Sequence, residues 1–593
     1  MRITRASSSV RTSSARWLAE AMHLRVPLVC LFAALVACGC AAPNTSGQPP
    51  STSAPQQSSA STQPSLGPKR LTAAIQGDPF TVYQKLNLSG SVRGVSEIQS
   101  LVHAGLTVMD TAGQLHPELA EAVPTVDNGL WQVKPDGSMV TTWKIRAGAE
   151  WQNGVPLQAD DFVFTMQVVR DPTLPAFRDL AYSHIKDVAA ADPQTVVVNW
   201  SQPFIRADQL FSDKIAMPLP KHLLESAYMQ DPVSFTNLPY WSSDFVGLGP
   251  YMIKEFERSS HVLVQANDRF VLGRPKIDEI DIQTIPDANA IVAALLAGTV
   301  DVVFNRTLSL DQAVQLRDRW PDGTVLFPLS SLMSMDPQML NPTPAVVGDL
   351  QFRRAVLESI DRQQLADGID YGLTPPADGI LDPSTPEYKA TQSAIVKYPY
   401  DPRQAAQAIE SLGYTKAADG LYHDASGEPL RLEIRASQGE INPKTMLAVA
   451  DDLQRAGIGI DPVVIPLQLV NDEEYRSNFP AYIVNGQPEA LTLLERFHSS
   501  NARVAENHYT GDNRARYMNP EMDSLIDRYV TTIPLDARME LARQITQHIT
   551  TNLPIMPLFY DSWPGAQVKR LVNATAQVGV GNADWNAWEW DLQ

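Results

Sequence analysis

A serine and a lysine at the spacing of an SxxK motif are the residues of this sequence best suited to nucleophilic chemistry. In Ser183-His184-Ile185-Lys186 the lysine could act as the base that activates the serine. The KTG motif that accompanies SxxK in acyl-transferring enzymes does not occur in the sequence. A four-residue pattern with two fixed positions arises easily by chance, so we expect no catalytic role for Ser183 and Lys186.

Other catalytic and cofactor motifs do not occur in the sequence. It contains no GxxxxGK[ST] phosphate loop, no HExxH zinc motif and no GxSxG nucleophile elbow. The ten histidines are mostly single, without close pairs at the spacing of metal ligands. Gly247-Leu248-Gly249-Pro250 has proline where a dinucleotide fingerprint enters its helix. The sequence therefore predicts binding without catalysis, metal or cofactor.

The three cysteines all lie within the first 40 residues. Five arginines precede a 12-residue apolar run, Val26 to Ala37, which is too short to cross a bilayer. Leu35-Val36-Ala37-Cys38 resembles the lipobox of bacterial lipoproteins, whose signal is cut before a cysteine that then carries lipid. We expect residues 1–37 to be a signal peptide and Cys38 to be lipidated. Cys40 is the weaker candidate, and a frayed N-terminal helix or anchor is the alternative.

The segment after the cysteines is rich in Pro, Ser, Thr and Gln. Such a composition cannot bury enough apolar area to fold, so we expect residues 38–69 to form an extended tether. The formal net charge is −19, which disfavours nucleic acid or an anionic membrane surface as the primary partner. A lipid anchor, a tether and a globular body together are typical of a receptor held at a membrane.

The body must position its site with alternating strands and helices. Residues 193–200 and 279–285 are predicted strands, and residues 159–171 are a predicted helix. In residues 287–304 and 444–465 a helix is expected to stop at a glycine, Gly298 or Gly457, and a strand follows. Residues 403–413 are a further predicted helix. This pattern indicates an α/β or α+β protein, and 593 residues allow two to four folded units.

Five stretches, in order along the chain, resemble segments of solute-binding family 5, the extracytoplasmic oligopeptide- and dipeptide-binding proteins of ABC importers. They are Glu97 to Leu106 with Pro117 to Glu121; residues 136–167; VGLGPYMI (246–253) with Asn267 to Phe270 and AIVAALLAGTVDVV (290–303); Asn341 to Arg362; and NPEMDSLID (519–527) with Arg538 and LPIMPLFY (553–560). Each stretch alone is a weak signal, whereas the ordered set is strong.

The resemblance implies an α/β two-lobed periplasmic-binding-protein fold of type II, in its large class with an extra subdomain, with the cleft between the lobes. We expect residues 70–100, 247–330 and 560–593 to form lobe I, residues 101–246 to form its subdomain, and residues 331–559 to form lobe II. Crossings between the lobes are expected near residues 325–340 and 553–565. A solute would bind in the cleft and be enclosed when the lobes close.

The resemblance also implies where a solute is met, because the family binds a peptide backbone as an added strand. The loop before the first family helix and a second loop on lobe II carry much of that binding, and aromatic residues supply apolar walls. Packing in the core is the alternative role of Trp241, and solvation that of Arg93. The candidate contacts are Ser91 and Arg93 on lobe I, Asn485, Gln487 and Arg496 on lobe II, and Tyr240 and Trp241.

The lobe II loop departs from the family pattern. Peptide-binding members carry an aspartate there, which pairs with the α-ammonium of the peptide. The matching segment here, Asn485-Gly486-Gln487-Pro488, is apparently shorter and has no acid. We therefore expect ordinary peptides with a free N-terminus to bind weakly or not at all.

The combined prediction is a monomeric, lipid-anchored extracytoplasmic binding protein that delivers a peptide or peptide-like small solute to an ABC permease. Two alternatives stay open. A receptor of the same fold could feed a sensor or an envelope-assembly pathway, which neighbouring permease genes would argue against. An extracytoplasmic hydrolase would require Ser183 beside Lys186 and a second base in an enclosed pocket.

Overall fold

β-Sheets of seven, five and four strands organise the residues that the structure describes. The computed structural model describes residues 67–86, 94–174, 181–304, 307–488, 491–574 and 583–593. The expected signal peptide, Cys38 and nearly all of the tether lie outside the described residues, as do Ser91 and Arg93. Residues 66–593 form one compact unit.

The seven-stranded sheet belongs to the first lobe and is built from segments near both ends of the described chain. Its order is β12-β20-β11-β1-β10-β9-β8, and β1 runs parallel to both of its neighbours. The strands are β1 (Arg70–Ile75), β8 (Tyr251–Glu257), β9 (His261–Ala266), β10 (Glu279–Thr284), β11 (Val302–Val303), β12 (Gly323–Leu326) and β20 (Gly565–Val568).

Helix α6 (Ala288–Ala297) connects β10 to β11 and ends where the sequence predicts. The carboxylate of Asp287 accepts hydrogen bonds from the backbone N–H groups of Asn289 and Ala290, which starts the helix. Gly298 ends it with a φ of 70°, in the left-handed region that favours glycine. The strand expected over residues 300–304 is shorter and covers only β11.

A second, four-stranded antiparallel sheet lies within residues 131–200, in the range expected to form the subdomain. Its order is β4-β5-β7-β6, and the predicted strand over residues 193–200 is confirmed as β7. The predicted helix over residues 159–171 is confirmed as α2 (Ala159–Val169), which packs on β6. The strands are β4 (Trp131–Val133), β5 (Met139–Lys144), β6 (Ile185–Asp192) and β7 (Thr195–Trp200).

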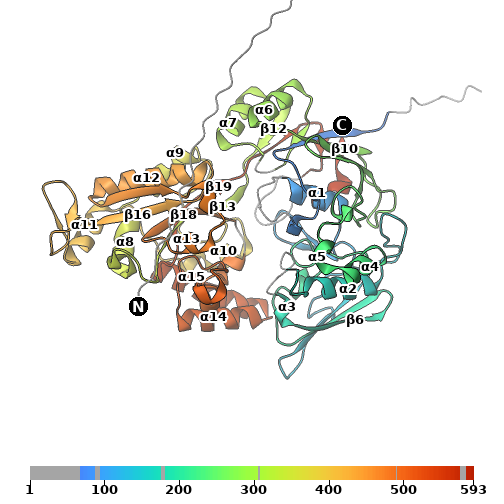
Figure 1. The fold of residues 1–593 in the computed structure, drawn as a ribbon, viewed down its shortest axis with the longest axis horizontal. Helices are drawn as coiled ribbons and strands as arrows, with labels where there is room; N and C mark the ends of the chain where they lie inside the picture. The colour runs from blue at the N-terminus through green and yellow to red at the C-terminus, as the bar shows by residue number, and fades with distance from the viewer. Residues whose placement is uncertain (1–66, 87–93, 175–180, 305–306, 489–490, 575–582) are drawn as a thin grey trace, which may run out of the picture. The chain divides into compact units, whose positions relative to one another are not determined.

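The five-stranded sheet forms the second lobe, in the order β17-β16-β18-β13-β19. Helix α12 (Ile441–Ala456) connects the parallel strands β16 and β17, lies against the sheet (Figure 1) and ends at Gly457, whose φ is 101°. The strands are β13 (Leu329–Pro337), β16 (Arg431–Ala436), β17 (Gly459–Val464), β18 (Tyr482–Pro488) and β19 (Met556–Ser562).

The chain passes between the two lobes at two places within the described residues. β12 ends in the seven-stranded sheet at Leu326, and β13 begins in the five-stranded sheet at Leu329. β19 ends in the second lobe at Ser562, and β20 begins in the first lobe at Gly565. Both crossings fall within the ranges expected from the sequence, and two short connections are the geometry on which lobes can swing.

Helices cover the sheets of both lobes. No helix among the described residues is long and apolar enough to span a membrane. The remaining α-helices are α1 (Val95–Val102), α3 (Ala181–His184), α4 (Lys221–Gln230), α5 (Pro232–Phe235), α7 (Leu310–Arg319), α8 (Leu350–Glu358), α9 (Arg362–Ile369), α10 (Pro386–Thr391), α11 (Pro402–Ser411), α13 (Glu473–Ser477), α14 (Pro520–Thr531) and α15 (Leu535–Asn552).

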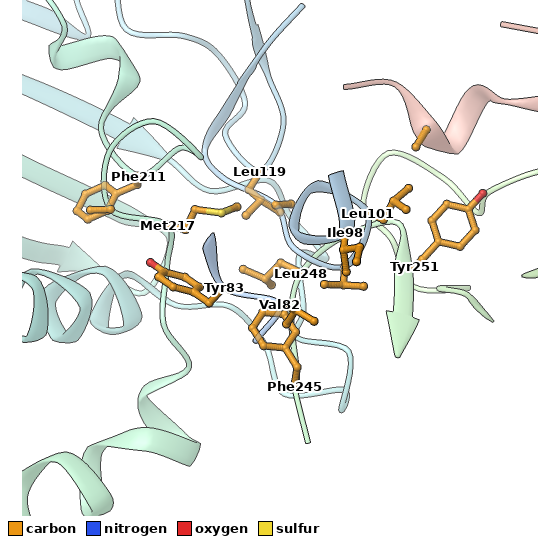
Figure 2. Packing of buried hydrophobic residues seen from close by; sticks show 14 of the residues in the cluster. Val82, Tyr83, Ile98, Leu101, Leu119, Phe211, Met217, Phe245, Leu248 and Tyr251 are labelled. Atoms are coloured by element: carbon orange, nitrogen blue, oxygen red, sulfur yellow. The ribbon is translucent and has the colours of Figure 1, made fainter. Parts of the chain in front are cut away.

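The apolar core of the first lobe gathers segments that are far apart in the sequence. Figure 2 shows Ile98 and Leu101 of α1 together with Val82, from the segment after β1, and Tyr251, at the start of β8. All four side chains are fully buried. Helix α1 therefore joins the N-terminal strand to the later strands of the same lobe.

Candidate functional site

Polar side chains gather on one of the two faces of the five-stranded sheet of the second lobe. Side chains alternate along a strand, and directly paired residues share a face. Met335 of β13 pairs with Val484 of β18, and both belong to the apolar core. Ser334 pairs with Asn485 on the opposite face. We call this second surface the polar face; its polar side chains are Ser334, Asp336, Asn485, Gln487 and Arg435.

A buried ion pair lies on the polar face. Nη2 of Arg496 is 3.1 Å from Oδ2 of Asp336, and the two side chains are 4% and 2% exposed. Oδ1 of Asp336 accepts a hydrogen bond from the Ser334 hydroxyl at 3.0 Å, and Nε of Arg496 donates to the carbonyl of Asp512 at 2.7 Å. Arg496, a predicted solute contact, is thus already held by protein groups.

Asn485 and Gln487 lie in a strand. The loop expected from the sequence at this segment is therefore wrong. Residues 482–488 form β18 because they pair along their length with β13. Both side chains are buried, at 3% and 4% exposure. Oδ1 of Asn485 accepts a hydrogen bond from the Ser437 hydroxyl. Nδ2 of Asn485 and Nε2 of Gln487 have no hydrogen-bond partner in the part of the chain that the structure describes.

The end of β18 has a partly open edge. β16 pairs with β18 only as far as Ala436 and Val484. Beyond that point, the backbone N–H of Gly486 donates instead to the side chain of Asn442, at 3.0 Å. A strand edge with backbone groups that no neighbouring strand uses is where an extended ligand can add.

Tyr240 and Trp241, the predicted aromatic contacts, lie in the core of the first lobe. They belong to a 3-10 helix over Pro239–Trp241 and are 7% and 2% exposed. Nε1 of Trp241 donates to the carbonyl of Phe235 at 2.7 Å, and the Tyr240 hydroxyl donates to the carbonyl of Val246 at 3.1 Å. Both polar groups are satisfied by backbone, and contact of either ring with a solute stays a prediction.

A cavity of about 610 Å³ lies between the two lobes. Its volume falls in the range of about 300–1,000 Å³ that is usual for small-molecule sites. One wall comes from the first lobe and the other from helices and loops of the second. The lining includes Met109, Leu115, Arg206, Asp208 and Lys214 from the first lobe and Asp382, Glu387, Glu495, Tyr529 and Arg538 from the second. Apart from Arg538, which belongs to the fifth family stretch, the sequence did not single out these residues, because they lie on separate segments up to several hundred positions apart.

Direct contacts join the lobes at the edge of this cavity. The backbone N–H of Ile205 donates to the carbonyl of Val530 at 3.2 Å. Nη2 of Arg206 is 3.3 Å from Oε2 of Glu495, and the two side chains are 19% and 15% exposed. Ile205 packs within an apolar cluster whose other members come from the second lobe. The structure thus has the lobes in contact on this side.

The cavity contains polar atoms that the protein leaves unsatisfied. Within the described residues, Nε of Arg206, Oδ1 of Asp208 and Oδ2 of Asp382 are buried without a hydrogen-bond partner. Burial raises the pKa of Asp208 to about 7, against the lowering effect of Arg538 and Arg206. Unsatisfied polar atoms around a cavity of this size are available to water or to a polar solute.

The residues that could support catalysis do not meet in an enclosed site. Ser183 lies in α3 and Lys186 lies in β6. Both side chains are exposed at the surface. Among the described residues, no three His, Cys, Asp or Glu side chains are grouped so as to hold a metal ion. The arrangement can enclose and orient a solute, and the described part supplies no nucleophile with an enclosed base.

Comparison with known proteins places the chain in a family. The model of "Bacterial extracellular solute-binding proteins, family 5 Middle" matches residues 114–502. The oligopeptide-binding protein AppA of Bacillus subtilis is 23% identical over 472 residues, covering 79% of this chain and 82% of AppA. Heme-binding protein A of Haemophilus influenzae is 23% identical over 470 residues, covering 75% of this chain and 79% of that protein.

Solved structures share the fold. The oligopeptide-binding protein of Thermus thermophilus, complexed with a pentapeptide, has a TM-score of 0.71 at 21% identity, covering 89% of this chain and 97% of that one. The periplasmic EDTA-binding protein EppA has a TM-score of 0.73 at 18% identity, covering 88% of this chain and 96% of that one. These likenesses confirm the two-lobed α/β fold, and the matched family model shows that the chain belongs to family 5 of the bacterial extracellular solute-binding proteins.

Proposed function

We propose that this protein captures a peptide or peptide-like small solute between its lobes and delivers it to an ABC permease. The observation that carries the proposal is the cavity of about 610 Å³, whose walls come from both lobes of a chain with two crossings. A solute that contacts both walls favours the state in which the lobes are together. The relatives named for oligopeptide binding support a peptide-like solute.

Capture is tested by identifying the solute bound to the purified protein. Delivery is tested by measuring uptake of that solute by the host. The protein is purified from its host and examined by native mass spectrometry for a co-purified small molecule. The bound molecule is then supplied to host cells with and without the gene. The proposal requires a bound solute and gene-dependent uptake; a protein that carries none and a host whose uptake is unchanged would contradict it.

The proposal includes a lipid anchor at Cys38, in a protein that works outside the cytoplasm. Cys38→Ala is expected to release the protein from the membrane fraction, whereas Cys40→Ala is not. Immunoblots of membrane and soluble fractions measure this. Release by the Cys40 change alone would move the cleavage site by two residues. Retention of both variants would contradict an anchor of this type.

The segment Asn485 to Pro488 bears on the kind of peptide that binds. It presents amide groups at the end of β18 and no carboxylate that could pair with an α-ammonium. We therefore expect a pool of unmodified di- to pentapeptides to bind weakly or not at all in a calorimetric titration. Binding at micromolar affinity or tighter would contradict this expectation.

Gln487→Asp tests the same segment from the opposite direction. The new carboxylate would be almost fully buried, at a position that is 4% exposed in the wild type. We expect one of two results: measurable binding of free peptides, or weaker binding of the co-purified solute because a buried charge is left unmatched. An unchanged affinity for both would show that position 487 does not contact the solute.

A further inference from the structure

The open edge of β18 has a single backbone donor beyond the end of β16. Along a strand, successive residues direct their N–H and C=O groups alternately to the two sides. The carbonyl of Ala481 accepts a hydrogen bond from the backbone N–H of Gln338, just beyond β13, so Ala481 and every second residue after it face β13. Gly486 and Pro488 therefore face the open edge. Proline has no N–H, so of these two residues only Gly486 can donate there.

The side chain of Asn442 already accepts from this donor. Oδ1 of Asn442 lies 3.0 Å from the backbone nitrogen of Gly486. Nδ2 of the same amide donates to the carbonyl of Gln438 at 3.3 Å, so both ends of the amide are used and its orientation is fixed. The amide oxygen thus takes the place that a backbone carbonyl of an added strand would take.

A helix holds Asn442 at this edge. Asn442 lies in the first turn of α12, and later turns of the helix bury Met446 and Leu453 in the apolar core of the second lobe. Between β16 and α12, the Ser437 hydroxyl donates to the side chain of Asn485. Side chains that follow β16 in the sequence therefore cover β18 where β16 itself stops pairing.

We infer that Asn442 excludes extended peptide backbones from the edge of β18, and so restricts the solute to compact molecules that do not pair as a strand. The inference rests on the proposed capture function and adds the class of solute. A peptide that added to this edge would have to displace Asn442 from Gly486. It would exchange one hydrogen bond for another and lose the net gain on which strand addition depends.

The test uses peptides without charged ends, because the exclusion acts on the peptide backbone. A pool of N-acetylated, C-amidated tetrapeptides and the same pool with methylated backbone nitrogens are titrated into wild type and into Asn442→Ala. A methylated backbone cannot donate to a strand edge. We expect wild type to bind the two pools equally. Asn442→Ala should bind the unmethylated pool about three- to tenfold more tightly than the methylated pool, the usual range for one net hydrogen bond.

Two control variants accompany Asn442→Ala. Asn442→Asp keeps an acceptor for the N–H of Gly486 and should behave as wild type with both pools. Asn552→Ala removes an asparagine of α15 whose Nδ2 likewise donates to the carbonyl four residues earlier, that of His548, at 3.0 Å. It should also behave as wild type. Asn442 is partly exposed, so its truncation leaves no closed cavity, and circular dichroism checks that each variant is folded.

Three results would overturn the inference. A preference of wild type for the unmethylated pool would show that peptide backbones pair with β18 despite Asn442. The absence of such a preference in Asn442→Ala would show that this side chain is not what keeps them out. A linear peptide of four or more residues as the co-purified solute would contradict it directly.

Failure of the inference and failure of the capture function give different results. If the titrations go against the role of Asn442 while the protein carries a solute whose uptake depends on the gene, the capture function stands. If the protein carries no solute of any kind and uptake is unchanged without the gene, the capture function falls, and the restriction to compact solutes falls with it.

Discussion

Asp336 in the second lobe and two buried acids of the first lobe, Glu118 and Asp584, have contrasting surroundings. In the second lobe Asp336 is 2% exposed and lies against Arg496. In the first lobe Glu118 and Asp584 are equally buried, and within the described residues neither forms an ion pair. Oε2 of Glu118 accepts one hydrogen bond, from the backbone N–H of Gly105 at 2.9 Å. Both oxygens of Asp584 have no partner there.

The first-lobe acids surround a small internal cavity of about 20 Å³, together with His103. Burial raises the pKa of Glu118 to about 8, and burial with the charge of Glu97 raises the pKa of Asp584 well above its ordinary value. Burial lowers the pKa of His103 to about 4. At neutral pH Glu118 therefore largely keeps its proton, and the His103 imidazole carries no additional proton.

The contrast shows two ways of burying an ionisable group. A charge taken out of water must be paired or removed, because the desolvation penalty is several kcal/mol per ion. Asp336 is paired with Arg496 on the polar face. Glu118 has no ion-pair partner among the described residues, and burial raises its pKa to about 8, so it contributes packing but little electric field at neutral pH.

The largest expected effect on stability comes from breaking the buried ion pair between Asp336 and Arg496. Asp336→Ala leaves Arg496 buried without its partner and should lower the free energy of unfolding by about 3–5 kcal/mol. Asp461→Ala breaks the exposed pair with Arg431 on the same sheet and should cost about 1 kcal/mol or less. Urea denaturation of the three proteins measures this. Equal losses in the two variants would mean that burial of the pair has no special importance.

An intermediate effect on stability is expected from replacing Glu118 in the first lobe. This effect depends on pH. Below about pH 4.5 Glu118 is protonated in the folded and the unfolded chain. Between pH 4.5 and 8 the unfolded chain loses this proton and the folded chain keeps it, so stability falls as pH rises. Glu118→Gln lacks this titration. Its stability relative to wild type should therefore rise by about 3 kcal/mol between pH 5 and pH 8.

The stability of Glu118→Gln is compared with that of wild type at each pH. The comparison is needed because the titration of His103 changes stability with pH in the opposite direction. Its folded-state pKa is lowered, so its contribution falls as pH decreases through 6.5 toward 4 in both proteins and cancels. The measurement is denaturant unfolding at several pH values. A difference that does not change with pH would show that Glu118 is ionised in the folded protein and that the contrast between the lobes is wrong.

The smallest effect on stability is expected at the contact between the lobes. Arg206→Ala removes the pair with Glu495 and should cost about 1 kcal/mol or less, because the pair is only partly buried. Its effect on shape should be clearer, since small-angle scattering should give a larger radius of gyration without solute. Arg543→Ala, which breaks an exposed pair within α15, is the control and should leave the radius unchanged.

Local signals in the sequence predicted the elements well. Gly298 and Gly457 mark helix ends because only glycine adopts the left-handed conformation there at little cost. The strand predicted over residues 193–200 is found as β7 (Thr195–Trp200). The segment Asn485 to Pro488 was wrong as a loop, because its pairing partner, β13, lies some 150 positions earlier and gives no local signal.

The candidate site was harder to predict for the same physical reason. The partner of Arg496 is 160 positions away, so the sequence could not show that this arginine is occupied. The cavity lining comes from separate segments of both lobes. Ordered family stretches identified the scaffold, whereas site chemistry depends on contacts between distant segments.

Both ends of the described chain belong to the first lobe. Lys69, just before β1, pairs with Asp591, and its backbone carbonyl accepts a hydrogen bond from Asp278. β22 (Asp591–Leu592) pairs with β21 (Leu571–Val572), only three residues beyond β20. A force applied through the residues before 67 would therefore act on the first lobe. The second lobe is connected to it through the short links at 327–328 and 563–564. With the anchor proposed at Cys38, the first lobe would be the lobe held at the membrane, and the second lobe could rotate about the two links without twisting the segment before residue 67.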